Sequence, residues 1–98
     1  MEVLPDPCPI CGREMRRGRS IDRHHFVPRS RGGRETEFVH RVCHRKLHSL
    51  FTEKQLAAEF STPEAIHADP DMAAFISWVR KKPPEFYDNS RTAKRKRG

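Results

Sequence analysis

The sequence predicts a small α+β domain in which a β-hairpin and a helix form a metal-stapled core and two or three helices follow. Three observations lead to this class. The chain has 98 residues, 35% of them hydrophobic and 34% charged, so its apolar core is thin and a staple is needed. Two Cys/His pairs with the same two-residue gap can supply that staple. A short stretch rich in β-branched residues lies between the pairs, and helical patterns follow it.

The first element is an irregular zinc knuckle within residues 1–19. Cys8 and Cys11 lie there in a turn punctuated by proline and glycine. His40 and Cys43 have the same spacing, and four such ligands make a closed tetrahedral site for Zn²⁺. The alternative is free thiols and a surface histidine. The scarcity of core residues favours structural zinc, whose binding is then part of folding.

A hairpin is expected next. Residues 20–28 predict a short strand, because β-branched and aromatic side chains precede a terminating Pro28. Gly32 and Gly33 then allow a loop whose backbone other residues cannot adopt. A second short strand near residues 37–40 completes the hairpin.

Helical patterns occupy the chain from residue 41 onward. The first continues to about residue 51. Residues 52–55 (TEKQ) have capping-box spacing and predict a helix to about residue 60. Residues 62–63 and 69–70 each join an N-cap side chain to a proline at the first helical position.

The helical segments also supply the predicted core. Trp78 either packs with this core or stacks on a base, and its helical spacing beside core residues favours packing. The apolar residues expected to meet there are Leu47, Leu50, Phe51, Leu56, Phe60, Phe75, Ile76 and Val79.

Charge is unevenly distributed along the chain. The formal net charge is +7, with +5 in residues 1–51, −3 in residues 52–80 and +5 in residues 81–98. A polyanion lying over the first half suits this pattern, because phosphate contacts release counterions. The alternative is an ordinary solvated basic surface.

Cysteine usage and hydropathy indicate the compartment. Three cysteines, an odd number, and the lack of an apolar secretory segment argue against a disulfide framework. No run of about 18 apolar residues is present to span a membrane. We therefore expect a cytoplasmic protein in a reducing environment.

Four of the six histidines form a second constellation. His44 and His48 are four residues apart and share one helical face. His24 and His25 are adjacent on a strand and point to opposite sides, so one can bind a metal while the other acts as a general base. Each histidine alone is more simply a capping or solvated residue. Together they favour a hydrolytic metal site with open coordination positions, and His67 fits no site.

These motifs carry a family resemblance. The segments Cys8-x-x-Cys11, residues 22–33 (DRHHFVPRSRGG) and residues 40–48 (HRVCHRKLH) resemble an HNH endonuclease with a zinc-knuckle ββα-metal fold. The match covers residues 8–48, about half of the chain. It implies a nuclease that cuts phosphodiester bonds in DNA with one divalent cation.

The resemblance also implies residue roles. His24 takes the place of the first metal ligand and His25 that of the general base. His44 is the second ligand, and His48 is the third ligand or a phosphate contact. Imidazole ligands suit Mn²⁺, Ni²⁺, Zn²⁺ or Co²⁺, and Mg²⁺ is unusual with three nitrogen ligands. The residues expected to contact DNA phosphates are Arg29, Arg31, Arg34 and Arg45.

The predicted organisation has three segments. Residues 1–51 form the zinc-knuckle HNH nuclease core, residues 52–87 a helical extension packed on it, and residues 88–98 a basic, disordered tail. The family's middle Asn has no counterpart, and Glu35 or Thr36 is expected to hold the loop instead.

Two other function classes are open at this point. A non-catalytic zinc-binding nucleic-acid module explains the knuckles and the charge but not the extra histidines. A protein–protein adaptor would use the acidic helical face. Metal stoichiometry separates them from a nuclease, which needs an exchangeable ion besides the zinc.

Overall fold

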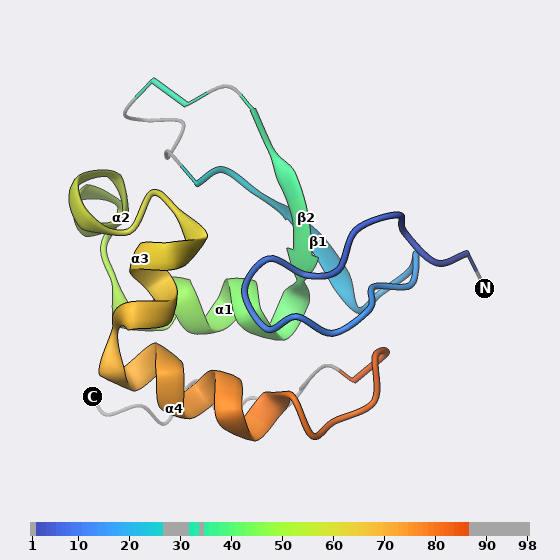
Figure 1. Cartoon of the computed structure of the whole chain (residues 1–98). Helices are drawn as coiled ribbons and strands as arrows, with labels where there is room; N and C mark the ends of the chain where they lie inside the picture. Colours follow the sequence, from blue (N-terminus) through green and yellow to red (C-terminus); the bar gives the residue numbers. More distant parts are fainter. Residues whose placement is uncertain (1, 27–31, 34, 87–98) are drawn as a thin grey trace.

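A computed structural model describes residues 2–26, 32–33 and 35–86 (Figure 1). Within these residues two strands and then four helices follow one another, which confirms the predicted α+β class with three helices after the hairpin–helix core. The elements are β1 (Ile21–His24), β2 (Glu37–His40), α1 (Arg41–Leu50), α2 (Glu53–Glu59), α3 (Pro63–Ala68) and α4 (Pro70–Val79).

The hairpin is antiparallel and short. Ile21 pairs with His40 at one end of the register, and His24 pairs with Glu37 at the other. The strand predicted over residues 20–28 was therefore too long, because β2 offers no further residues for β1 to pair with. Residues 27 and 28 lie outside the described part of the chain. Since β2 leads directly into α1, the hairpin and the first helix form one continuous unit.

The helix starts agree with the sequence. Thr52 and Gln55 form the predicted capping box at the start of α2, with the Gln55 N–H donating to Thr52 Oγ1 at 3.1 Å. Thr62 and Asp69 cap α3 and α4, each followed by proline at the first helical position. Side-chain capping satisfies N–H groups that helix ends leave without a partner.

Figure 1 shows α1 in the middle of the molecule, with the hairpin on one side of it and α4 on the other. The described helices include none long and apolar enough to cross a membrane.

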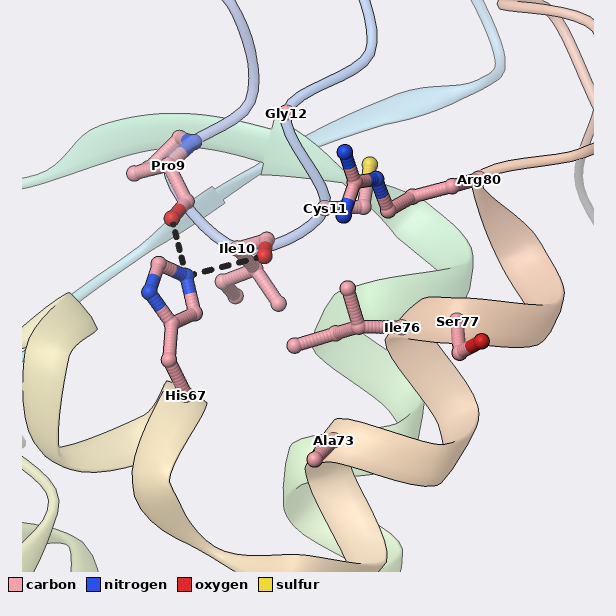
Figure 2. Close-up of a pocket in the computed structure, with 9 residues that line it drawn as sticks. All are labelled: Pro9, Ile10, Cys11, Gly12, His67, Ala73, Ile76, Ser77 and Arg80. Carbon is pink, nitrogen blue, oxygen red and sulfur yellow. Dashed lines mark hydrogen bonds between the residues drawn. The ribbon is translucent and has the colours of Figure 1, made fainter.

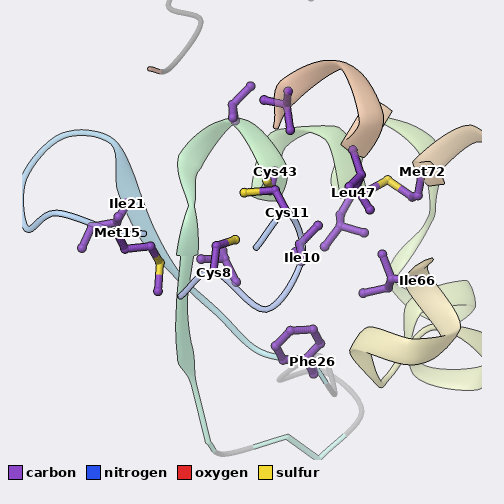
Figure 3. Packing of buried hydrophobic residues seen from close by; sticks show 14 of the residues in the cluster. Cys8, Ile10, Cys11, Met15, Ile21, Phe26, Cys43, Leu47, Ile66 and Met72 are labelled. Atoms are coloured by element: carbon purple, nitrogen blue, oxygen red, sulfur yellow. The ribbon is translucent and has the colours of Figure 1, made fainter. Parts of the chain in front are cut away.

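The core joins the knuckle to the helices. Figure 3 shows Ile10 of the knuckle in the same cluster as Leu47, Ile66 and Met72. Each fully buried aliphatic side chain of this kind contributes roughly 1.5–3 kcal/mol of transfer free energy. Leu47, Leu56, Ile76 and Val79 are buried as predicted, while Leu50, Phe51, Phe60 and Phe75 are partly buried. Ile10 and Ile66 were not predicted.

Trp78 does not belong to the core. Its side chain is 46% exposed, so the favoured expectation of packing was wrong. Trp78 lies one residue before the buried Val79 and two after the buried Ile76, which places it on the outer side of α4.

The knuckle is also held by polar contacts. His67 of α3 places Nε2 2.9 Å from the Pro9 carbonyl oxygen and 3.0 Å from that of Ile10 (Figure 2). Val3 and Arg16 form an isolated antiparallel bridge that brings the two ends of the knuckle together. His67, which fitted no site in the sequence, thus ties α3 to the knuckle.

Candidate functional site

A sulfur-rich cluster lies between the knuckle and the start of α1. Each of Cys8, Cys11, His40 and Cys43 offers one ligand atom, and these four atoms all lie within 4.8 Å of one another. All four residues are buried and the three cysteines are unbridged. Three thiols and one imidazole in this arrangement are a donor set that could hold Zn²⁺ in a closed site.

Hydrogen bonding within the cluster shifts the pKa values of its members in different directions. Hydrogen bonds from Cys43 and Cys8 lower the pKa of the Cys11 thiol, which favours its thiolate form. The same bonds raise the pKa of Cys43. Burial is the largest single influence on His40 and lowers its pKa, but hydrogen bonds to Cys11 and Cys8 and the charges of these two residues together outweigh it and raise the pKa to about 9. A proton on His40 therefore occupies the place that a metal ion would take, and metal binding would release it.

A second layer of contacts orients the cluster. His40 Nδ1 is 3.3 Å from Cys11 Sγ, and Nε2 is 2.9 Å from the Pro84 carbonyl oxygen. Because a carbonyl only accepts, Nε2 is the donor, and Nδ1 is left as the metal-binding atom. Arg13 donates from Nε to Cys11 Sγ at 3.3 Å and from Nη1 to the Pro83 oxygen at 2.6 Å. The chain after α4 is thus bonded to two residues of the knuckle region.

A second cluster joins the end of β1 to α1. His24, His44 and His48 each offer a nitrogen, and these atoms lie within 4.8 Å of one another. The ring centroids are 5.1 Å apart for His24 and His44, and 4.8 Å apart for His44 and His48. The cluster forms because β1 ends beside the face of α1 that carries residues i and i+4.

The donor atoms of the histidine cluster fit a metal ion. His24 Nε2 is buried and has no hydrogen-bond partner in the structure. Such an orphaned atom costs folding free energy unless a ligand satisfies it. Burial and the charges of His44 and His48 lower the pKa of His24 to about 4. Burial, followed by the charge of His44, also lowers the pKa of His48, so both rings are neutral and able to bind a metal at pH 7.

Asp22, two residues before His24 on β1, supports the histidine cluster. His44 Nδ1 donates to Asp22 Oδ2 at 3.2 Å, which fixes the ring and leaves Nε2 free to coordinate. Arg41 Nε approaches Asp22 Oδ1 at 3.7 Å. A carboxylate behind an imidazole raises the basicity of the ligand.

The remaining predicted residues are only partly placed. His25 follows β1 directly and is partly buried, and Arg45 is exposed on α1. Arg29, Arg31 and Arg34 lie outside the described residues, as does the predicted disorder of residues 88–98. Glu35 or Thr36 was expected to replace the family's middle Asn. Thr36 Oγ1 accepts a hydrogen bond from Arg23 Nη1 at 3.2 Å, whereas Glu35 is exposed.

Two supporting residues were missed in the sequence. Asp22 is two residues before His24, so alternation along a strand places both side chains on one face, which is a usable signal. Arg13 follows the knuckle turn, and nothing in the sequence pairs it with Pro83, 70 residues away.

Comparison with known proteins points in one direction. A family model described as HNH endonuclease matches residues 8–50. The chain is 34% identical over 80 residues to "Uncharacterized protein YisB" of Bacillus subtilis (strain 168), covering 80% of this chain and 77% of that relative. No solved structure matches the chain at a significant level.

Proposed function

The chain belongs to the HNH endonuclease family, and from this membership we propose that it is a metal-dependent endonuclease that hydrolyses phosphodiester bonds in DNA. The histidine cluster is the observation that supports this most. A purely structural metal role needs only the cysteine cluster, which already provides four ligands. The convergence of His24, His44 and His48, with one buried nitrogen unpartnered, calls for a second ion.

The two clusters would hold different ions. Cys8, Cys11, His40 and Cys43 would hold a structural Zn²⁺. His24, His44 and His48 would hold an exchangeable divalent cation, and three protein ligands leave coordination positions open. Nitrogen ligands favour Mn²⁺, Ni²⁺, Zn²⁺ or Co²⁺ over Mg²⁺. When bound, this cation supplies Lewis-acid stabilisation of charge on the phosphate and on the leaving 3′ oxygen.

We assign the general base to His25. Its place directly after His24 puts it beside the proposed metal ligands. A histidine has an ordinary pKa near neutrality, which suits a group that must take a proton from the attacking water. The division of labour between the adjacent residues follows, with His24 as ligand and His25 as base.

Basic side chains would position the DNA. Arg45 is exposed on α1, one residue after His44, so it lies about 100° around the helix from that ligand. Arg29, Arg31 and Arg34 fall between β1 and β2 in the sequence, in a half of the chain with net charge +5. Contacts of this type fix the register of a backbone without reading base sequence.

A plasmid-nicking assay tests the proposal. Zinc-loaded protein is supplied in turn with Mn²⁺, Ni²⁺, Co²⁺ and Mg²⁺, and the wild type is compared with His25→Ala. We expect His25→Ala to cut about 10²–10⁴-fold more slowly, the usual contribution of a general base, while it binds duplex DNA nearly as well. Lys54→Ala, an exposed change on α2, serves as the matched control and keeps wild-type activity.

The same assay separates the rival function. If no cation supports nicking, the chain is a zinc-binding nucleic-acid module without catalysis. Equal cleavage by wild type and His25→Ala would remove the assigned base.

A further inference from the structure

An aromatic and basic surface lies on α4 and the segment after it. Trp78 lies between Phe75 and Phe86, with ring centroids 6.0 and 5.9 Å away. Lys82 Nζ is 4.8 Å from the Trp78 ring centroid, and Lys46 Nζ of α1 is 5.7 Å from that of Phe75. We name these five residues the α4 aromatic patch.

The patch lies away from the histidine cluster. Lys46 is two residues from both His44 and His48, so it is about 160–200° around α1 from either ligand. Its contact with Phe75 shows that α4 packs on that opposite side of α1. The patch therefore plays no part in the metal chemistry proposed above.

Its exposure and charge call for a partner. Trp78 is 46% exposed, and Phe75 and Phe86 beside it are only partly buried, so the three rings form one contiguous apolar patch. The helix end continues into Arg80-Lys81-Lys82, of which Arg80 and Lys81 are exposed. The acidic residue nearest in sequence, Glu85, approaches Arg16 at 3.9 Å. The aromatic rings of the patch can stack on other rings, and the lysines beside them attract negative charge. The complementary partner is therefore both aromatic and anionic.

We propose that the α4 aromatic patch is a second nucleic-acid contact, which stacks bases of an unpaired strand on Trp78 and binds its phosphates through Lys46 and Lys82. Every base has a π-face, so such a platform accepts any sequence. In the free protein Lys82 covers the ring. Stacking of a base is worth more than an exposed lysine–ring contact, so a base displaces the ammonium group, which then meets the phosphate. Paired bases cannot stack in this way, so duplex DNA is a poorer partner.

Trp78 is itself the reporter, because the chain contains one tryptophan. Zinc-loaded full-length protein without added divalent cation is titrated with oligothymidylate, with oligouridylate and with a duplex of equal length. We expect the single strands to quench the tryptophan fluorescence with an affinity that falls as salt rises, and the duplex to quench it much less. The two single-strand arms show whether DNA or RNA is preferred.

Variants separate stacking from general charge. Trp78→Leu, followed by anisotropy of a labelled oligonucleotide, should bind single strands about ten-fold more weakly. Lys82→Gln should weaken binding several-fold and reduce its salt dependence. Lys54→Gln removes the same charge from exposed α2 and should change affinity little. Because Trp78 is on the surface, melting temperatures should stay close to that of the wild type.

Three results would overturn the proposal. One is single-strand affinity that is the same in Trp78→Leu and wild type. Another is an equal loss in Lys54→Gln and Lys82→Gln. The third is fluorescence that changes with protein concentration alone, together with a dimer in sedimentation, which would make the patch an interface between copies. None of these depends on cleavage, so this contact and the proposed nuclease activity can fail separately.

Discussion

At the scale of single residues, metal binding by the two clusters depends on which nitrogen of each imidazole is available. In both clusters a partner on the far side of a ring selects the coordinating atom. The Pro84 carbonyl does this for His40, and the Asp22 carboxylate does it for His44. Such partners hold the ring orientation and the tautomer before any ion arrives.

Asp22→Asn tests this positioning. The change keeps the shape but removes the charge behind His44, so we expect the exchangeable cation to bind about 10–100-fold more weakly. Isothermal titration of zinc-loaded protein with Mn²⁺ or Co²⁺ measures it. Asp71→Asn, the same change in the first turn of α4, should leave the affinity unaltered. An unchanged affinity in Asp22→Asn would show that the carboxylate does not position the ligand.

The buried His24 predicts a pH dependence of stability. Its pKa is about 4 in the folded protein against an ordinary value of 6.5. The unfolded chain therefore binds the proton more readily, and the stabilisation is present above pH 6.5 and is lost as the pH falls toward 4. The shift corresponds to roughly 3 kcal/mol.

Denaturant unfolding of zinc-loaded protein without a second cation checks this between pH 6.5 and 5. His24→Gln, which does not titrate, should show a flatter profile than the wild type over that range. Parallel profiles would contradict the assigned shift.

The sequence predicted the residues that could hold metals better than those that support them. Spacing alone grouped His40 with the cysteines and His44 with His48, because both relations are local. Arg13 acts on Pro83, far away in the chain, and no local rule connects them, whereas strand alternation with His24 was a usable signal for Asp22. The roles of His25 and of the loop arginines stay predictions.

At the scale of elements, the segment after α4 is bonded to the zinc knuckle. Arg13 joins Cys11 to the Pro83 oxygen, and His40 donates to the Pro84 oxygen. Arg13 and His40 are the donors, and the two proline carbonyl oxygens accept these bonds. Knuckle and helical extension are thereby coupled at the metal cluster.

Arg13→Met should loosen this segment. It removes one charged donor each from the Cys11 sulfur and the Pro83 oxygen, at a cost of about 1–3 kcal/mol in the free energy of unfolding. Amide exchange of Phe86, whose N–H donates to the Pro83 oxygen at 3.0 Å, should accelerate.

Arg17→Met provides the matched control. It breaks an exposed ion pair with Glu2. Such surface pairs typically contribute about 0–1 kcal/mol to the free energy of unfolding. Equal exchange rates in the two variants would show that Arg13 does not hold the segment.

Element boundaries followed from local chemistry where that chemistry was present. Thr52, Thr62 and Asp69 each cap a helix as predicted, since an N-cap needs only its own next three residues. The end of β1 was misjudged because strand length depends on the partner strand, which begins only at Glu37. Trp78 was misjudged because helical spacing identifies a face but not what covers it.

At the scale of the whole molecule, zinc should decide whether the chain folds. The buried cluster contains knuckle residues as well as helical ones, so loss of the knuckle exposes one side of the core. Structural zinc contributes about 10–16 kcal/mol in small domains of this kind, more than a thin core can replace.

Chelation of zinc is therefore expected to unfold the chain, with loss of helical circular dichroism and recovery on adding zinc back. Cys43→Ser should show the same loss without chelator. A chelated protein that keeps its spectrum and a cooperative melt would show that the cysteine cluster is not a staple.

The fold class was predictable because the small apolar fraction and the equal spacing of Cys8–Cys11 and His40–Cys43 indicated a metal-stapled hairpin and helix. The packing of α3 against the knuckle was not, since His67 contacts residues more than 50 positions away. The division of the chain at residues 51 and 52 stays a prediction.

The central claim is that the histidine cluster binds a cation separate from the zinc. Titration calorimetry of zinc-loaded protein with Co²⁺ and Mn²⁺, with total metal counted by elemental analysis, tests it most directly. We expect the wild type to bind one tight zinc and one exchangeable ion per chain. His24→Ala and His48→Ala should bind the zinc alone. A wild type that binds a single ion in total, or variants that keep both, would contradict it.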